Sequence, residues 1–271
     1  MLEKRKELVI ERPEQLMKVS TRRDFLRLLG IGGSIVLLPS VFAACDDDEG
    51  MTGPGTPTTV TLNLSNDTGI LNYAYALEQL EAAFYTAVVA STPFGSFNTE
   101  QQELFYDLRN HEVLHREFFR AALGTSAIGT LNLNTATVNA TLTSRDVILK
   151  NAEMFEDLGV AAYNGAGKYL TTAANLTIAG KIVSVEARHA AAIRDLRESL
   201  GVSGGVAAGT RFAGDDVVLA STAFAGLDVK LEPSAVASRV IATGIVADTL
   251  SIGTQPPTKS GTPDFGPPPT P

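Results

Sequence analysis

The stretches 112-EVLH-115 and 186-EARH-189 share one pattern, in which a glutamate is followed three residues later by a histidine. Residues three apart in an α-helix lie on the same side, about 60° apart around the axis and about 4.5 Å along it. Each pair is flanked at one helical turn by apolar residues, namely Leu108, Phe119, Ile182 and Ile193. Both pairs are therefore predicted to project from the apolar faces of their helices.

Two further glutamates occupy similar positions in other helical segments. Glu78 is followed seven residues later by Tyr85, and Glu156 is followed at the same distance by Tyr163. Because both glutamates lie among apolar residues at helical spacing, they are predicted to face the interior of the fold. The chain thus looks like two copies of one helical hairpin, each with a glutamate on its first helix and Glu-x-x-His on its second.

Four segments carry the apolar spacing of long helices. They run from Asn66 or Asp67 past Val88, from a capping box at Asn98–Thr99 to Gly124, from Thr143 or Ser144 to about Leu170, and through Ile178 to Gly201. Short connections join the first helix to the second and the third to the fourth, whereas residues 124–143 are long enough to run the length of a bundle. One long crossover is the connectivity of ferritin-like bundles. We therefore predict an all-α fold, a ferritin-like four-helix bundle over residues 66–201.

The N-terminal region has the pattern of an export signal. In 21-TRRDFLR-27 two adjacent arginines precede an uncharged run over residues 28–44, which resembles a twin-arginine (Tat) signal peptide. The stretch 42-FAAC-45 resembles a lipobox, and Cys45 is the one cysteine in the sequence. We expect residues 1–44 to direct export and a lipidated Cys45 to anchor the protein to a membrane of the cell envelope, on its periplasmic or outer side. Lipidation would leave no thiol for a disulfide or a rubredoxin-type module.

The remaining segments are expected to surround the bundle. Residues 45–65 are acidic and rich in Gly, Pro and Thr, as is typical of a tether. Residues 202–250 are expected to form an accessory segment packed on the bundle, with a C-terminal helix over residues 234–250 after a turn at Pro233. Residues 251–271 are expected to form a Pro-rich disordered tail.

The charge distribution argues against nucleic acid as a partner. The formal net charge is −8, and residues 1–27 hold eight of the 22 basic residues but only five of the 30 acidic residues. The chain that follows is therefore strongly acidic and would repel a phosphate backbone.

Four buried carboxylates need positive charge nearby. A buried carboxylate that stays ionised and unpaired destabilises a fold by roughly several kcal/mol. Two divalent metal ions would neutralise four glutamates, and two neutral histidines would complete the ligand set. Glutamates that bridge two ions, with one histidine at each, are the arrangement of di-iron and di-manganese carboxylate proteins. The ligand types do not distinguish iron from manganese.

At these residues the sequence resembles a known family. The stretches 70-ILNYAYALEQLEAAFY-85, 112-EVLH-115, 156-EDLGVAAYNGA-166 and 186-EARHAAAIR-194 are similar to the ferritin-like domain family of exported bacterial proteins, relatives of rubrerythrins and ferritins. The resemblance covers about residues 62–200. It implies that the metal ligands are Glu78, Glu112, His115, Glu156, Glu186 and His189.

Several neighbouring residues have more than one interpretation. Glu81 and Glu153 lie one turn from Glu78 and Glu156 and are candidates for additional ligands, unless they are partly exposed. Tyr85 and Tyr163 are candidates for redox-active or hydrogen-bonding groups beside the ligands, or else ordinary core tyrosines. His111 is interpreted as an outer partner of the site or a surface residue rather than as a seventh ligand.

Three classes of function are compatible with this sequence. The first is an oxidoreductase whose two metal ions react with dioxygen or peroxide, as a ferroxidase, a peroxidase or a catalase. The second is a metal-binding protein for stress protection or storage, without turnover. The third is a metal-free structural bundle of the cell envelope. The oligomeric state is left open by the sequence.

Overall fold

The computed structural model describes residues 57–202 and 226–254. The expected signal peptide, Cys45 and the Pro-rich tail beyond residue 254 lie outside this part of the chain. The twin-arginine and lipidation hypotheses therefore stay predictions.

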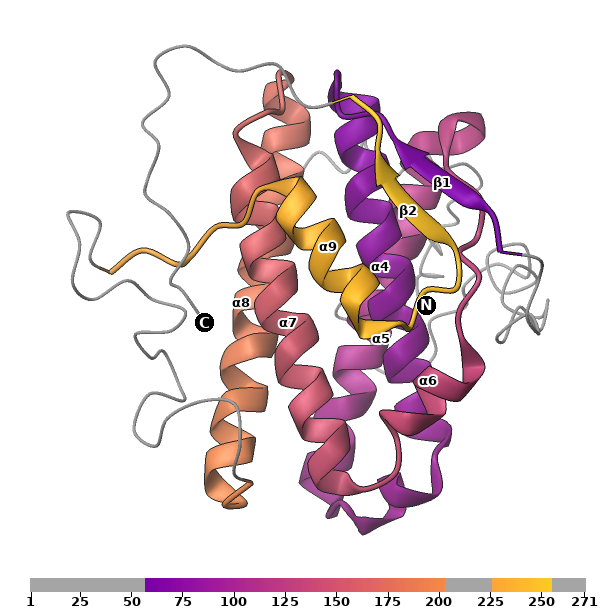
Figure 1. The fold of residues 1–271 in the computed structure, drawn as a ribbon. Coiled ribbons are helices and arrows are strands. Elements are labelled where there is room, and N and C mark those ends of the chain that lie inside the picture. The colour runs from indigo at the N-terminus through magenta and orange to yellow at the C-terminus, as the bar shows by residue number, and fades with distance from the viewer. Residues whose placement is uncertain (1–56, 203–225, 255–271) are drawn as a thin grey trace, which may run out of the picture. The chain divides into compact units, whose positions relative to one another are not determined.

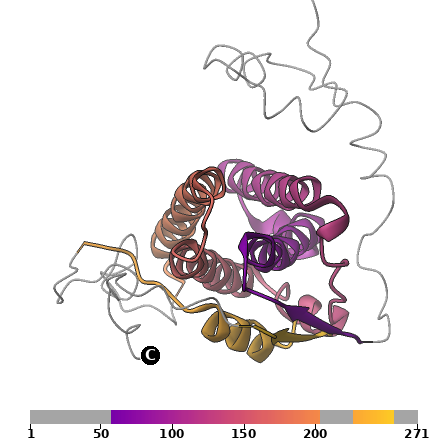
Figure 2. The same ribbon diagram turned by 90° about the horizontal axis from the view of Figure 1, so that it is seen from above.

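Four long helices form the bundle. They are α4 (Asp67–Ala90), α5 (Thr99–Leu123), α7 (Arg145–Gly167) and α8 (Ala173–Ser199). Figure 1 shows α4 beside α5 and α7 beside α8, and the view along the bundle in Figure 2 shows all four arranged in a ring. The predicted all-α bundle is confirmed, with boundaries close to those expected from helical spacing.

Side chains at the helix starts hold the helix ends in place. The Asn66 side chain accepts a hydrogen bond from the Gly69 backbone amide, and Asn98 forms the predicted capping box with Gln101. Asp67 also links two helices, because its carboxylate accepts hydrogen bonds from the Thr171 and Thr172 amides just before α8. These bonds hold the first turn of α4 against the first turn of α8.

The long crossover runs between α5 and α7 and includes the 3-10 turn Gly124–Ser126 and the short helix α6 (Thr135–Ala140). Two buried amide side chains of α4 hold it. Asn72 accepts a hydrogen bond from the Ile128 amide at 2.7 Å, and Gln79 accepts one from the Leu131 amide at 2.8 Å. Because these buried amides bond to the crossover backbone, they fix its path along the bundle.

The structure contains two short strands that the sequence analysis did not predict. Strand β1 (Thr59–Leu62), at the end of the expected tether, pairs in parallel with β2 (Thr249–Ile252). The helix expected over residues 234–250 is α9 (Pro233–Thr243), which begins at Pro233 and ends at Gly244, where φ is +65°. That left-handed conformation favours glycine and terminates the helix, so the chain after it is free to pair with β1.

The described part of the accessory segment, from residue 226 onward, packs against the bundle beside α7. The Leu231 amide donates to the Ala161 carbonyl at 2.9 Å, and a Cβ atom on Gly165 would lie 1.8 Å from the Leu231 carbonyl oxygen. Only glycine at position 165 permits this approach. In Figure 2, α9 and the strands lie together on the side of the bundle formed by α4 and α7.

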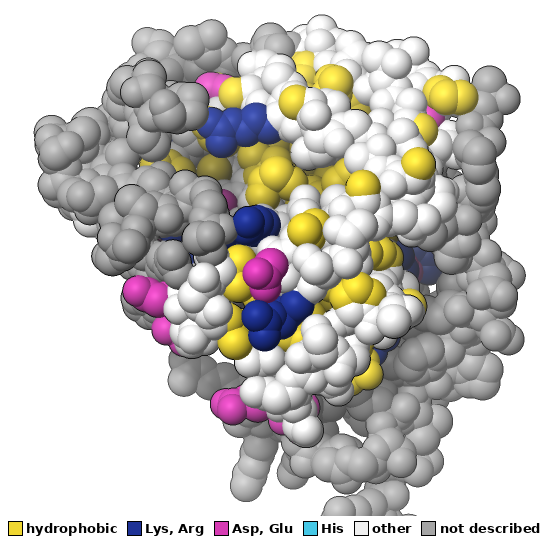
Figure 3. Space-filling model, turned by 60° about the horizontal axis from the view of Figure 1, so that its bottom comes forward, with side chains coloured by type: hydrophobic (Ala, Val, Ile, Leu, Met, Phe, Trp, Pro, Cys, Tyr) yellow, Lys and Arg dark blue, Asp and Glu magenta, His cyan; other side chains and the backbone are white. Residues whose placement is uncertain are grey.

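The surface of the described residues has mixed character. On the face in Figure 3, hydrophobic side chains lie among basic and acidic ones, and no histidine side chain is visible. Within residues 57–202 and 226–254, no helix combines the length and apolar character needed to cross a membrane.

Candidate metal centre

The six predicted ligands meet in the middle of the bundle. Glu78 comes from α4, Glu112 and His115 from α5, Glu156 from α7, and Glu186 and His189 from α8. All four glutamates have an exposed fraction of 0%, and His189 has 5%. Each helix therefore turns its ionisable residue inward among apolar neighbours, as the spacing predicted.

Their ligand atoms form two groups. One group consists of Glu78, Glu112, His115 and Glu186, and the other of Glu112, Glu156, Glu186 and His189. Within each group, one ligand atom from every residue lies within 4.8 Å of the others. Glu112 and Glu186 belong to both groups, so these two carboxylates lie between the two histidines.

Both histidines point their Nδ1 atoms at the carboxylates. His115 Nδ1 lies 3.0 Å from Glu186 Oε1 and 3.4 Å from oxygens of Glu78 and Glu112. His189 Nδ1 lies 2.8 Å from Glu112 Oε1 and 3.4 Å from Glu156 Oε2. Each imidazole thus occupies one end of the carboxylate cluster.

Many of these buried atoms have no hydrogen-bond partner among the described residues. They include both oxygens of Glu112 and of Glu186, one oxygen each of Glu78 and Glu156, and Nδ1 of both histidines. Buried polar atoms are nearly always satisfied in folded proteins. Here the imidazole nitrogens and carboxylate oxygens lie close together without being aligned as hydrogen bonds, which is how ligand atoms converge on a cation, so this set fits a metal ion.

The pKa values of the glutamates also indicate that the cluster requires positive charge. Burial raises the pKa of Glu78 well above its usual range, and burial raises that of Glu156 to about 8. Burial would also raise the pKa of Glu112, but its contacts with His115 and His189 lower it to about 2. When no cation is bound, protons and imidazolium groups would supply the positive charge that a cation provides.

For the two histidines, burial and the neighbouring carboxylates shift the pKa in opposite directions. Burial lowers the pKa of His115, yet its contacts with Glu112, Glu186 and Glu78 raise it to about 12. For His189 burial again lowers the pKa, and the charge of Glu156 together with contacts to the carboxylates raises it to about 12. A metal ion would therefore displace protons from both rings.

The two tyrosines contact the glutamates across the bundle. Tyr85, on α4, donates a hydrogen bond to Glu156 Oε1 of α7 at 2.5 Å, and Tyr163, on α7, donates one to Glu78 Oε1 of α4. Burial raises the pKa of both hydroxyls well above the usual range. Each half of the pseudo-repeat thus orients the carboxylate of the other half.

The two extra glutamates differ from each other. Both are buried, with exposed fractions of 3% for Glu81 and 4% for Glu153, so the alternative that they are partly exposed is wrong. Glu153 Oε1 pairs with Arg197 Nη1 at 2.5 Å. Glu81 points toward the cluster instead, because a Cβ atom on Gly159 would lie 3.0 Å from Glu81 Oε1 and 3.6 Å from Glu186 Oε2.

His111 lies outside the cluster but contacts one of its members. Its Nδ1 atom lies 2.9 Å from His189 Nε2, and the two rings are stacked with centroids 5.1 Å apart. The contact leaves His189 Nδ1 facing the carboxylates. A partner on the second ring nitrogen is the usual way of fixing the orientation of a ligating histidine.

The structure also contains buried pairs that the spacing did not indicate. The Arg194 guanidinium, 2% exposed, donates to both oxygens of Asp157, at 2.8 and 2.6 Å. Together with Arg197 and Glu153 it joins α7 to α8 on the His189 side of the bundle. Arginines near the end of an apolar helix face were the available sequence signal.

Fold and cluster together define a four-helix bundle with a buried carboxylate–histidine cluster of the kind that holds metal ions. A model of the ferritin-like domain family matches residues 66–199, which is almost the same span as the bundle. No curated protein matches the chain.

Proposed function

We propose that the cluster binds two iron or manganese ions, bridged by Glu112 and Glu186. Glu78 and His115 would hold one ion, and Glu156 and His189 would hold the other. The observation that carries this proposal is the sharing of Glu112 and Glu186 by two four-residue groups, each with one histidine. Four carboxylates balance the charge of two divalent ions, and carboxylate with imidazole suits iron and manganese.

Glu81 is proposed as an additional ligand, and Glu153 is not. Glu81 Oε2 is buried without a hydrogen-bond partner among the described residues. A Cβ atom on Gly159 would contact both Glu81 Oε1 and Glu186 Oε2, so the two carboxylates lie on the same side of Gly159. The carboxylate of Glu153 is neutralised by Arg197. A fifth carboxylate would make the two metal positions unequal, because the residue equivalent to Glu81 in the second hairpin is Gly159.

Such a pair of ions would supply redox chemistry toward dioxygen or peroxide, of ferroxidase, peroxidase or catalase type. The protein's own part is to hold the carboxylates in place and to exclude water. Tyr85 and Tyr163 hold Glu156 and Glu78 through hydrogen bonds, and the four glutamates are fully buried. Storage or protection without turnover remains the alternative, in which the same residues hold the ions and no oxidant reacts.

Elemental analysis of protein purified without chelator tests this proposal. We expect about two Fe or Mn per chain, the number that two ligand groups predict, and loss of metal in Glu112→Ala and His189→Ala. Glu103→Ala, an exposed glutamate on the same helix as Glu112, is the matched control and should keep its metal. Metal-free protein even after reconstitution would leave a structural bundle. A change in electronic absorption on adding peroxide separates turnover from storage.

We further propose that residues 1–44 direct export by a twin-arginine route and that Cys45 carries a lipid anchor. The adjacent Arg22 and Arg23 and the 42-FAAC-45 stretch support this. Incorporation of a labelled fatty acid into the full chain should be lost in Cys45→Ala. Equal labelling of both proteins would contradict lipidation at this residue.

A further inference from the structure

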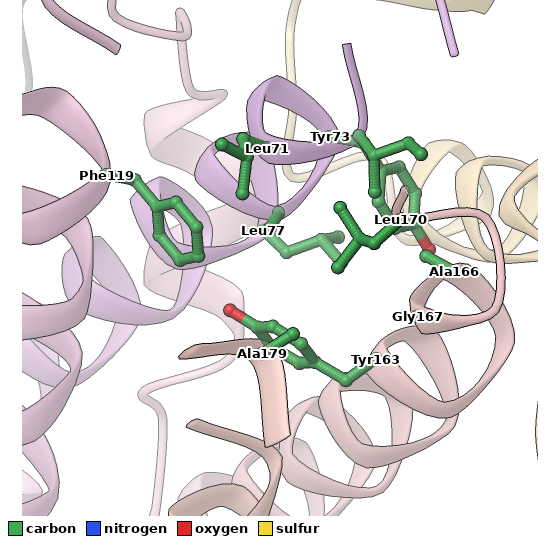
Figure 4. A pocket seen from close by; sticks show the side chains of 11 residues that line it. Leu71, Tyr73, Leu77, Phe119, Tyr163, Ala166, Gly167, Leu170 and Ala179 are labelled. Carbon is green, nitrogen blue, oxygen red and sulfur yellow. The ribbon is translucent and has the colours of Figure 1, made fainter. Parts of the chain in front are cut away.

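A small pocket lies close to the cluster on the side of Glu78. Its walls come from all four long helices, and include Ala74, Leu77, Phe119, Tyr163, Ala166 and Ala179. In Figure 4 the labelled side chains of Leu77, Phe119, Tyr163 and Ala179 surround a common space. The pocket has a volume of about 20 Å³, which is room for one small molecule and too little for an organic substrate.

The pocket is one layer of side chains away from the ligands. Ala74 precedes Glu78 by one helical turn, and Phe119 follows His115 by one turn. Tyr163 spans the remaining distance, because it lines the pocket and its hydroxyl donates to Glu78 Oε1. A molecule in the pocket would therefore lie next to the residue that holds a Glu78 oxygen.

The pocket lies where several positions on one half of the pseudo-repeat carry smaller residues than the matching positions on the other half. Counted from the equivalent glutamates of the two hairpins, the matching positions are Ala179 with Phe105, Leu77 with Phe155, and Ala166 with Val88. Around Tyr85 the larger residues are packed ring against ring, with centroids 4.9 Å apart for Phe84–Phe155 and 6.0 Å apart for Tyr85–Phe105. The space beside Tyr163 is thus a local difference between two otherwise similar ends.

The lining determines what this pocket can hold. It is almost entirely carbon, and its polar side-chain groups are the hydroxyls of Tyr73 and Tyr163, the second of which is bonded to Glu78. Hydrogen peroxide would lose most of its hydrogen bonds to water on moving into such a site, at a cost that dioxygen does not incur. A diatomic apolar molecule matches both the small volume and the apolar lining of the pocket.

We propose that this pocket binds dioxygen and admits it to the Glu78 end of the cluster. The inference rests on the proposed metal function, since it names the oxidant that reaches the ions. It predicts that dioxygen and peroxide approach the centre by different routes, and that only the first depends on the small side chain of Ala179.

Xenon binding to the metal-free protein tests the pocket by itself. Crystals or solutions under xenon pressure should show one xenon atom between Ala74, Phe119 and Ala179 in the natural protein. Ala179→Phe, which installs the residue of the equivalent position, and the milder Ala179→Leu should abolish this binding. Ala174→Leu, an exposed alanine on the same helix, should not change it. The absence of xenon from the natural protein would overturn the inference whatever the metal content.

The second measurement uses protein reconstituted with Fe(II). In Ala179→Leu, oxidation by dioxygen should slow by about tenfold or more while oxidation by peroxide stays within about twofold of the natural rate, a split that a general loss of the site would not give. Equal slowing with both oxidants, or unchanged dioxygen kinetics, would contradict the inference. A protein that binds xenon but no metal would refute the proposed function and leave a gas-binding pocket without that role.

Discussion

Metal binding should release protons in a number that the structure predicts. Without metal at pH 7, His115 and His189 carry protons because their carboxylate neighbours raise each pKa to about 12. Glu156 is mostly protonated because burial raises its pKa to about 8. Two ions that use these residues as ligands should therefore release at least three protons per chain at pH 7, and Glu78 and the proposed ligand Glu81, whose pKa values burial also raises, add to that number.

The number should depend on pH in a defined direction. Above pH 8 the Glu156 carboxylate is already mostly ionised, because its pKa is about 8, so the number of protons released should fall by about one between pH 7 and pH 9. Calorimetric titration with Mn(II) in buffers of different ionisation enthalpy measures this number directly. Glu103→Ala should match the natural protein, whereas His189→Ala should release fewer protons. Two bound ions with one proton released or none would refute the assignment of these residues as ligands.

Three further changes test other parts of the structure. Phe105→Ala should lower the free energy of unfolding by about 3–5 kcal/mol, because it removes a fully buried ring, and a chemical-denaturation midpoint measures this. Arg197→Ala should cost roughly 3–5 kcal/mol, since it leaves the Glu153 carboxylate buried without its partner, and the added mutation Glu153→Gln should recover part of the loss. His111→Ala should weaken metal binding by about 10- to 100-fold by removing the outer contact of His189, with recovery in His111→Gln, which keeps an acceptor. An unchanged metal affinity in His111→Ala would show that the contact does not position the ligand.

The bundle and the inward direction of its ionisable residues could be predicted from sequence because both follow from local periodicity. The spacing of Glu112 and His115 fixes a helical face, and the caps at Asn66, Asn98 and Ser144 set helix starts to within a residue. These features depend on neighbours a few positions away along the chain.

Contacts between distant segments could not be obtained in this way. Strand β1 forms because Thr59–Leu62 meets Thr249–Ile252, about 190 residues later, and neither segment alternates strongly enough to predict pairing. The different environments of Glu81 and Glu153 depend on Gly159 and Arg197, which lie on other helices or other turns. The pocket beside Tyr163 likewise depends on small residues from three helices, namely Ala74 of α4, Ala166 and Gly167 of α7, and Ala179 of α8.

The central claim is that Glu112 and Glu186 bridge two metal ions. Anomalous diffraction at the iron and manganese absorption edges, from crystals of protein purified without chelator, would test it most directly. The account predicts two peaks, one beside His115 and Glu78 and the other beside His189 and Glu156, with Glu112 and Glu186 contacting both. One peak shared by both histidines, or no peak after reconstitution with Fe(II) and Mn(II), would contradict it.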